Sequence, residues 1–365
     1  MTSMVRVRGE TARARARVCA VAVMLFAACT RSNTEPIPAT TVASFDRVWA
    51  SFDGTYPYFA LKGVAWAASR TAFRDRAAAA PSIDALNVIL LEMLAPLRDV
   101  HVALRGPNGA FQPSYRSPYQ SNFDRDRWLQ TMNANQYVQH RTNLSTARIG
   151  GIPYIAIGAW NGEQFTVNDL DQALARFQND SMLIVDVRMN GGGNDQLALD
   201  FAGRFVETPT VCEQYRYRTG PAPTDLGRLT SRVVAPRGPW TFRGRVYVLI
   251  GRSVFSSNES FVAAMRVAPR VQLLGDTTGG GSANPVTVPY ANGWTVSVSR
   301  WYASLPDGEP IEGKGIAPHV YIPLTASAQG DPIIAAAIAH ITTAQATRRQ
   351  LSIGASRQHR VRAVE

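Results

Sequence analysis

Two adjacent serines, Ser256 and Ser257, stand between an apolar, strand-like run over residues 246–250 and a helix-like segment that follows. The first backbone N–H groups of a helix have no partner within the helix, and the helix dipole favours negative charge there. A serine at this junction could therefore be a nucleophile whose attack creates an oxyanion. Serine is also a favoured helix cap, and on the local sequence alone capping is its commoner use.

Three further segments carry groups that such a nucleophile needs. The turn NGGG (190–193) directly follows the apolar run 182–188, at a strand end where α/β proteins bind ligands. His101, which follows Asp99 by two residues, could act as a base. Glu312 lies in a glycine-rich loop after a predicted strand. Each also has an ordinary structural interpretation: a tight turn, an exposed strand-end histidine and a surface carboxylate.

Several classes of function are disfavoured by the sequence. It contains no G-x-S-x-G, no H-E-x-x-H, no P-loop and no dinucleotide-binding glycine motif. The net charge of +11 comes from arginines spread along the chain, since only Lys62 and Lys314 are lysines. We therefore expect no nucleic-acid partner. Beyond Cys29 only Cys212 remains, so there is no cysteine cluster for zinc. We expect no metal and no cofactor.

The segments that would position these groups alternate between strand and helix patterns after residue 148, which predicts an α/β core. Helical periodicity before residue 104 predicts a small N-terminal helical domain, and the polar stretch between them predicts an irregular connector with short strands. The predicted divisions are a signal peptide (1–28), a tether (29–40), the helical domain (41–104), the connector (105–147), the core (148–345) and a basic tail (346–365).

The N-terminus has the pattern of an export signal. Arginines precede an apolar stretch over residues 18–28 that is too short to span a bilayer comfortably. Small residues before Cys29 resemble a bacterial lipobox, which predicts lipidation of Cys29; cleavage without lipidation is the alternative. We therefore expect a periplasmic protein of the bacterial cell envelope that touches the membrane only through a lipid anchor.

Taken in order, the segments LIVDVRMNGGG, FSSNES, LLGDTTGGGSA and EGKGIAPHV resemble the tail-specific, or C-terminal-processing, serine peptidase family. The segment LRDVH and the aromatic helical stretch over residues 45–66 resemble its tricorn-core and interphotoreceptor-retinoid-binding-protein-like branch. This resemblance implies an α/β fold with a ClpP/crotonase-like core and a small N-terminal helical domain. It also implies a serine peptidase that cleaves peptide or protein substrates through an acyl-enzyme.

The resemblance assigns roles to individual residues. Ser256 would be the nucleophile because it stands three residues before Glu259, as in the family's Ser-x-x-Glu pattern; Ser257 is its competitor. His101 would be the base, and Glu312 would orient its imidazole indirectly or through a hydroxyl.

The oxyanion hole would be formed by the backbone N–H of Ser257 together with that of Gly192 or Gly193.

Two positions bear on the identity of the base. The processing-protease branch has a lysine in its glycine-rich loop, and the matching position here is Gly281, so a Ser–Lys dyad in that loop is excluded. His319 replaces the aspartate of the usual Pro-Asp-Val segment and is a reserve candidate for the base, and Glu259 is a second reserve candidate for the site.

Two other functions stay open from the sequence. The same scaffold could be a non-catalytic binding protein for apolar ligands or peptides. Crotonase-like acyl chemistry is a weaker alternative, because acyl-CoA is cytosolic and the chain is expected to be exported.

Overall fold

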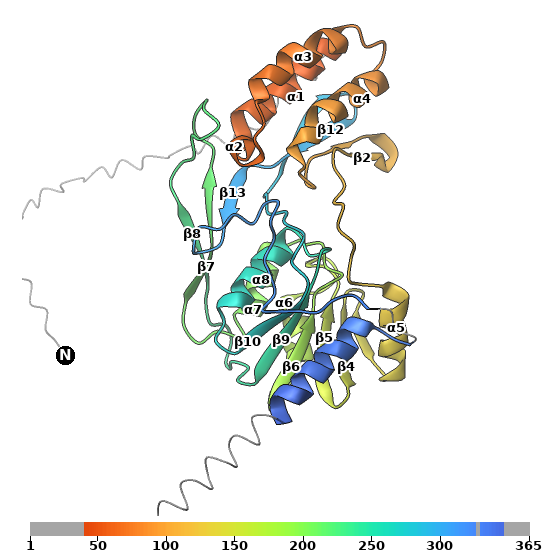
Figure 1. Cartoon of the computed structure of the whole chain (residues 1–365), viewed down its shortest axis with the longest axis vertical. Helices are drawn as coiled ribbons and strands as arrows, with labels where there is room; N and C mark the ends of the chain where they lie inside the picture. Colours follow the sequence, from red (N-terminus) through yellow and green to blue (C-terminus); the bar gives the residue numbers. More distant parts are fainter. Residues whose placement is uncertain (1–39, 326–328, 347–365) are drawn as a thin grey trace, which may run out of the picture. The chain divides into compact units, whose positions relative to one another are not determined.

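The structure is a computed structural model that describes residues 40–325 and 329–346 (Figure 1). Its helices are α1 (Thr41–Thr55), α2 (Phe59–Lys62), α3 (Trp66–Ala78), α4 (Ile83–Leu94), α5 (Arg125–Ala134), α6 (Val167–Ala175), α7 (Asp195–Ala202), α8 (Ser257–Val267) and a final helix over 332–346, with 3-10 turns η1 (Ala95–Leu97) and η2 (Pro107–Gly109). None of the described helices combines the length and apolar character needed to cross a membrane. The predicted signal peptide, Cys29, nearly all of the tether and nearly all of the basic tail lie outside the described residues.

The described strands form three sheets. They are β1 (Ala103–Arg105), β2 (Phe111–Pro113), β3 (Val138–Arg141), β4 (Leu144–Ile149), β5 (Ile152–Ile157), β6 (Met182–Asp186), β7 (Thr210–Tyr217), β8 (Thr230–Val234), β9 (Arg245–Ile250), β10 (Val271–Gly275), β11 (Val286–Ala291), β12 (Trp294–Val298), β13 (Trp301–Ser304) and β14 (Val320–Tyr321). The sheet orders are β14-β10-β9-β6-β5-β4-β3, β11-β12-β1-β2 and β13-β7-β8.

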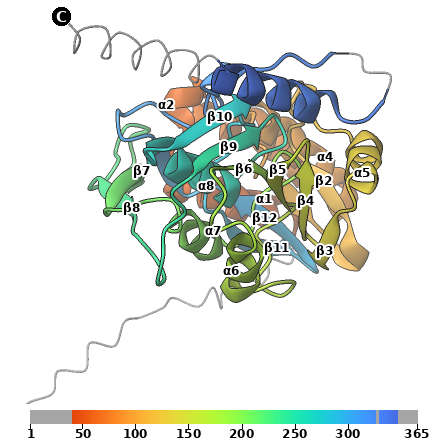
Figure 2. The same ribbon diagram turned by 90° about the horizontal axis from the view of Figure 1, so that it is seen from below.

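The seven-stranded sheet is covered by helices on both faces (Figure 2). Strands β5, β6, β9, β10 and β14 run parallel, whereas β3 and β4 add antiparallel pairs at one edge. Alternate residues of β9 face opposite ways: Val248 packs with Phe261 of α8, and Tyr247 packs with Ile333 of the final helix. Because successive strand residues point to opposite faces, a strand buried on both sides reads as a continuous apolar run. The expected α/β fold class with a helical N-terminal region is confirmed.

The N-terminal helices do not form their core from residues 41–104 alone. Phe45, Val48 and Phe52 of α1 pack with Tyr290 of β11 and Val296 of β12 in one hydrophobic cluster. Figure 1 shows β12 beside these helices. The hairpin β11–β12 therefore packs with the N-terminal helices, although the sequence placed it within the core region 148–345.

The stretch 105–147 is more regular than predicted. It contains helix α5 and strands β3 and β4, and β4 pairs with β5 over six residue pairs. The predicted short strands are present, whereas helix α5 was not predicted, and the C-terminal part of this stretch completes the edge of the main sheet. Its strand β3 is mostly exposed and polar, so hydrophobic periodicity could not reveal it.

Candidate active site

Ser256 occupies the N-cap position of α8 in a conformation that is unusual for a residue with a side chain. Its φ is 56° and its ψ is −133°, and its side chain makes no capping hydrogen bond. Positive φ costs free energy for a non-glycine residue, and such strain persists only where the surrounding structure imposes it. Its hydroxyl has no hydrogen-bond partner among the described residues. The structure therefore does not support a capping role for the Ser256 side chain.

Ser257 is held differently from Ser256. Its hydroxyl donates to the backbone carbonyl of Gly193 at 2.6 Å, so its only proton is already engaged. Of the two adjacent serines, Ser256 is thus the one whose hydroxyl is not committed.

A buried asparagine that the sequence reading missed joins this helix end to the NGGG turn. The Asn258 amide donates to the carbonyls of Val187 at 3.0 Å and Asn190 at 2.8 Å, and its oxygen accepts from the Trp160 indole at 3.0 Å. Because Asn258 is fully buried, these bonds satisfy its polar atoms and fix α8 against the turn. The position of Asn258, two residues after the candidate nucleophile, could have indicated a role in the site, but the spacing of residues did not indicate its hydrogen-bond partners.

The NGGG turn packs directly against Ser256. A Cβ on Gly192, whose φ is +112°, would lie 2.8 Å from the Ser256 Cβ and 2.9 Å from the Phe255 carbonyl oxygen. The Gly192 N–H donates to Asn190 Oδ1 at 2.8 Å, so it is not available to a ligand. Of the two glycines considered for an oxyanion hole, Gly193 is the one whose N–H has no partner among the described residues, and Ser257 N–H lies at the open first turn of α8.

Glu259 organises the glycine-rich loop on the other side of Ser256. Its fully buried carboxylate accepts hydrogen bonds from Thr278 Oγ1 at 2.6 Å, Gly280 N–H at 2.9 Å and Gly281 N–H at 2.7 Å. Burial raises the pKa of Glu259 to about 7, although these three donors oppose the shift. The loop in turn accepts the Ser256 N–H at the Gly281 carbonyl, at 2.7 Å.

His101 lies against the same loop. A Cβ on Gly281 would be 3.3 Å from His101 Cε1 and 2.8 Å from Val100 Cγ2. Gly281 therefore accepts a hydrogen bond from Ser256, and its missing side chain leaves room for the His101 ring. No hydrogen bond joins Ser256 to His101 in the structure, which is common in enzymes without bound substrate.

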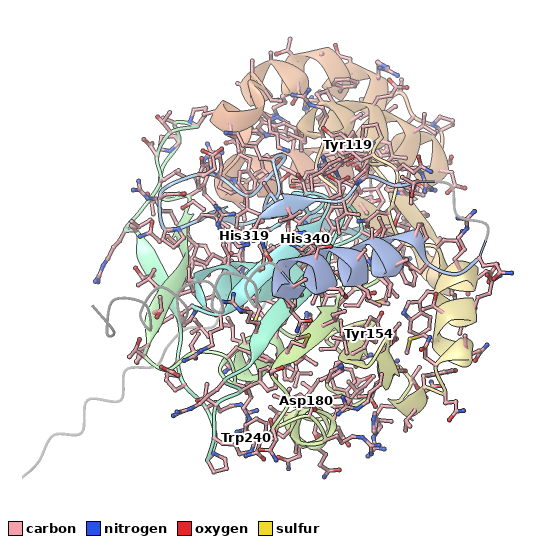
Figure 3. The ribbon with its side chains drawn as sticks, turned by 60° about the horizontal axis from the view of Figure 1, so that its bottom comes forward. Tyr119, Tyr154, Asp180, Trp240, His319 and His340 are labelled. Carbon is pink, nitrogen blue, oxygen red and sulfur yellow. The ribbon has the colours of Figure 1, made fainter. Side chains whose placement is uncertain are left out.

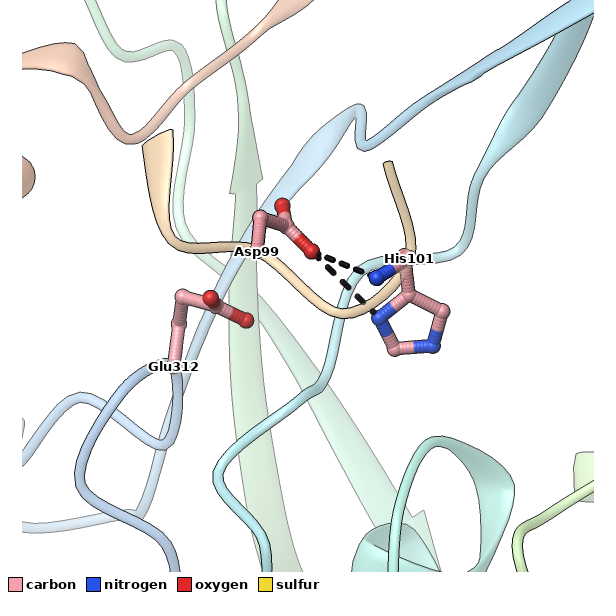
Figure 4. Close-up of side chains that lie close together, drawn as sticks. All are labelled: Asp99, His101 and Glu312. Carbon is pink, nitrogen blue, oxygen red and sulfur yellow. Dashed lines mark hydrogen bonds and ion pairs between the residues drawn. The ribbon is translucent and has the colours of Figure 1, made fainter. Parts of the chain in front are cut away.

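Asp99 is the carboxylate that lies next to His101 (Figure 4). Its Oδ1 accepts the His101 backbone N–H at 2.8 Å and lies 3.8 Å from His101 Nδ1, and its Oδ2 accepts from Ser299 Oγ at 2.7 Å. Burial lowers the pKa of His101 below its ordinary value of 6.5, and the charge of Asp99 partly opposes this shift. The imidazole therefore stays neutral to lower pH than an exposed histidine, and the neutral form is the one that can accept a proton.

Glu312 is buried beside Asp99 and His101 and forms an ion pair with Lys62. Lys62 Nζ, from α2, lies 2.7 Å from Glu312 Oε1 and also donates to the Arg98 carbonyl at 3.1 Å. Burial raises the pKa of Glu312 well above its ordinary value, and the charge of Asp99 adds to this shift while Lys62 opposes it. The sequence reading missed Lys62, although it is one of only two lysines in the chain.

The ligand atoms of Asp99, His101 and Glu312 lie within 4.8 Å of one another, so these three residues could hold a metal ion. Glu312 already pairs with Lys62, whose positive charge competes with a cation at that carboxylate.

The reserve base, His319, is engaged elsewhere (labelled in Figure 3). The His319 Nδ1 accepts a hydrogen bond from the backbone N–H of Leu273 on β10 at 2.9 Å. The backbone N–H of His319 donates to the Leu273 carbonyl. Burial lowers the pKa of His319, and Arg266 contributes to the shift. His319 therefore serves as a link between β10 and β14.

The fold and the comparisons with known proteins agree. The core is the ClpP-like α/β fold, joined to an N-terminal helical region. Mature CPAF has a similar fold, with a TM-score of 0.61 at 10% identity over 78% of this chain and 93% of that one. A crystal structure of a proposed peptidase from Parabacteroides merdae ATCC 43184 is similar at 27% identity and a TM-score of 0.75, over 83% of this chain and 96% of that one.

Residues 151–322 match the family described as Peptidase family S41, and this part of the chain is a peptidase S41 domain. The chain is also homologous to the carboxy-terminal processing protease CtpB of Bacillus subtilis (strain 168), with 26% identity over 173 residues, which are 47% of this chain and 34% of that protein. The aligned part thus spans about a third of the length of the curated relatives that the chain matches. The resemblance to the C-terminal-processing peptidase family is confirmed.

The Lys62–Glu312 pair yields a test of how the site is held together. The side chains are 7% and 1% exposed, so the variant Lys62→Met leaves a buried carboxylate without its cation. Removing one partner of a buried pair costs about 3–5 kcal/mol, and we expect Lys62→Met to lower the free energy of unfolding at pH 7 by about that amount. Chemical denaturation measures the change.

The other lysine is a matched control. Lys314 pairs with Glu309 at the surface, where the two side chains are 55% and 53% exposed, so Lys314→Met should leave the free energy of unfolding nearly unchanged. The double variant Lys62→Met/Glu312→Gln should recover part of the loss, because it removes the unpaired charge. An equal effect of the two single lysine variants would contradict a stabilising role of the buried pair.

Proposed function

We propose that the chain is a serine peptidase that hydrolyses peptide bonds through an acyl-enzyme, with Ser256 as the nucleophile and His101 as the general base. The observation that carries the proposal is the meeting of three elements at Gly281: its carbonyl accepts the Ser256 N–H, a Cβ at this position would lie 3.3 Å from His101 Cε1, and its N–H donates to Glu259. The S41 match over residues 151–322 supports the same function.

The proposed reaction follows from the positions of these groups. His101 Nε2 takes the proton of Ser256 Oγ as that oxygen attacks the substrate carbonyl carbon. The developing oxyanion accepts hydrogen bonds from the N–H groups of Gly193 and Ser257, each such donor contributing about 3–4 kcal/mol. The imidazolium then gives its proton to the leaving amine, and water attacks the acyl-enzyme with His101 again acting as the base.

Asp99 and Glu312 take different supporting roles in this proposal. Asp99 holds the Nδ1 side of the imidazole and stabilises the imidazolium, because it is the nearest carboxylate at 3.8 Å. Glu312 positions the segment indirectly: it binds Lys62, which donates to the Arg98 carbonyl next to Asp99.

A histidine base also accords with the glycine-rich loop. At Gly281, where the Ser–Lys branch has its lysine, there is no side chain, and the His101 ring occupies the adjacent space. We therefore propose the tricorn-core type of S41 site, without a Ser–Lys dyad. We also propose that the chain is exported, that Cys29 carries a lipid, and that its substrates are peptides or proteins of the cell envelope.

The second candidate is a binding protein for apolar ligands or peptides on this scaffold. It is favoured by the absence of a hydrogen bond between Ser256 and His101 in the part of the chain that the structure describes. Labelling by a fluorophosphonate probe separates the two functions, because only an activated serine reacts with it.

Ser256 should react with a fluorophosphonate probe in the full chain. We expect covalent labelling of the wild type, and loss of labelling in Ser256→Ala, because this probe reacts with activated serines. Intact-protein mass spectrometry measures the added mass. Ser257→Ala, the matched neighbour, should retain labelling; if only Ser257→Ala abolished it, the nucleophile would be Ser257, and an unlabelled wild type would favour the binding protein.

The pH dependence of hydrolysis should report His101. Because burial lowers its pKa, the neutral base persists to lower pH than in an exposed histidine, and kcat/KM should reach half its plateau below pH 6.5. Since the charge of Asp99 raises the His101 pKa, Asp99→Asn should move this acid limb to still lower pH and reduce the plateau. A limb near pH 7 would instead match Glu259, whose pKa is about 7, and would contradict the assignment to His101.

Gly192 and Gly191 form a matched pair for testing the oxyanion turn. Gly192→Ala places a Cβ 2.8 Å from that of Ser256 at a positive φ, whereas a Cβ on Gly191 meets nothing within 4 Å. We expect Gly192→Ala to lower kcat/KM by about 10²-fold or more, as loss of oxyanion stabilisation does, and Gly191→Ala to retain near-wild-type activity. Equal activity of the two variants would show that the turn does not shape the site.

A further inference from the structure

A small cavity of about 130 Å³ opens directly beside Ser256. The residues that line it include Gly193, Asp195, Ser260, Ser282 and Trp301. We call this cavity the serine pocket. Its size suits one short side chain, since pockets for drug-sized ligands are about 300–1,000 Å³.

A buried carboxylate behind the serine pocket sets the polarity of its wall. Glu213, on β7, is fully buried and accepts hydrogen bonds from Ser260 Oγ at 2.9 Å and Ser282 Oγ at 3.2 Å. A hydroxyl has one proton, so each serine that donates it to Glu213 can offer only oxygen lone pairs to a ligand. The serines therefore present hydrogen-bond acceptors.

Trp301 adds a donor that is not used. Trp301 is only 6% exposed, and no described residue accepts a hydrogen bond from its indole N–H. The ring is fixed between Tyr215, with centroids 4.9 Å apart, and the Arg232 guanidinium, 4.8 Å from its centroid. A buried donor without a partner costs about 1–3 kcal/mol, which a ligand with an acceptor can relieve.

The charges around the serine pocket are compensated within the protein. Arg232 lies 2.8 Å from Asp195 Oδ2 and 3.5 Å from Glu213 Oε2. Glu213 is not among the residues that line the cavity, and Asp195, which does line it, already pairs with Arg232. The cavity is thus polar without a free charge to select a lysine or an arginine.

We propose that the serine pocket is the subsite for the substrate side chain on the acyl side of the scissile bond, and that it selects serine or threonine. A short hydroxyl side chain can donate to the acceptor oxygens of Ser260 or Ser282 and accept from the Trp301 indole, whereas an aliphatic side chain leaves these groups unpaired. This assignment rests on the proposed peptidase function.

The acyl side follows from connectivity. The pocket shares Gly193 with the proposed oxyanion hole and Ser256 with the proposed nucleophile, so it lies beside the position of the substrate carbonyl carbon. The Cβ on the acyl side is two bonds from that carbon, and the Cβ on the leaving side is three bonds away. The acyl-side side chain is therefore the nearer one to the pocket.

The test compares isosteric side chains. The full chain is assayed with internally quenched peptides that differ only at the acyl-side position, which is threonine, valine, serine, alanine, leucine or lysine. We expect kcat/KM for threonine to exceed that for valine by about tenfold or more, because the unmatched polar groups of the pocket penalise valine. A threonine-to-valine ratio near one, or a preference for leucine or lysine, would overturn the assignment.

The variant Trp301→Phe keeps a ring and removes the indole N–H. We expect it to reduce the threonine-to-valine ratio to near one, whatever its effect on either rate alone. Trp240→Phe is the matched control, because Trp240 (labelled in Figure 3) also packs under an arginine, Arg204 at 4.8 Å, but does not line the serine pocket. It should leave the ratio unchanged. A ratio that survives Trp301→Phe would also overturn the assignment.

Two readouts keep this proposal separable from the proposed function. If the fluorophosphonate probe fails to label Ser256 and no peptide is hydrolysed, the peptidase function is wrong. If Ser256 is labelled and hydrolysis occurs without a preference for a hydroxyl side chain, the peptidase function stands and the serine-pocket assignment is wrong.

Discussion

The buried carboxylate of Glu259 is the interaction on which the candidate site depends. It sits in the first turn of α8 and binds two backbone N–H groups and one hydroxyl of the loop that contains Thr278 and Gly281. Burying a carboxylate is costly, and a pKa raised to about 7 reflects that cost. Three hydrogen-bond donors offset this cost, and the same bonds hold the loop where its Gly281 carbonyl accepts the Ser256 N–H. The positive φ of Ser256 is thus imposed by its surroundings.

The site also depends on contact between two parts of the fold. The N-terminal helical region contributes Lys62, Asp99 and His101, and the core contributes Ser256 and Glu312. Besides the Lys62–Glu312 pair, Tyr58 donates its hydroxyl proton to the Ser282 carbonyl, beside the serine pocket. Proximity of a base to a nucleophile contributes to catalysis only when the geometry is maintained. Packing of β11 and β12 on the N-terminal helices helps to hold the segment that carries His101, since Ser297 of β12 donates a hydrogen bond to the His101 carbonyl.

Much of the fold could be predicted from local patterns. Continuous apolar runs such as 182–188 indicated strands buried on both faces, and the spacing of Phe45, Val48 and Phe52 indicated a helix. Short strands were predicted between residues 105 and 147, but the place of β3 and β4 in the main sheet was not, because β3 lies at the sheet edge with exposed polar side chains and has no apolar period. The hairpin β11–β12 was recognised as strand-forming in part, but its packing partner, helix α1, lies about 240 residues earlier in the chain and leaves no local signal.

By itself, the sequence determined which residues could carry the chemistry: the ordered motifs around Ser256, Gly193, His101 and Glu312, and a glycine at 281 in place of a lysine. Only the tertiary structure decided among them. In the structure, the Ser257 hydroxyl and the Gly192 N–H form internal hydrogen bonds, and His319 is bound to β10. Asp99 rather than Glu312 lies next to the imidazole, and Glu312 pairs with Lys62. The physical reason is that residue type sets what a group can donate or accept. Which partner it finds depends on contacts between segments far apart in the chain.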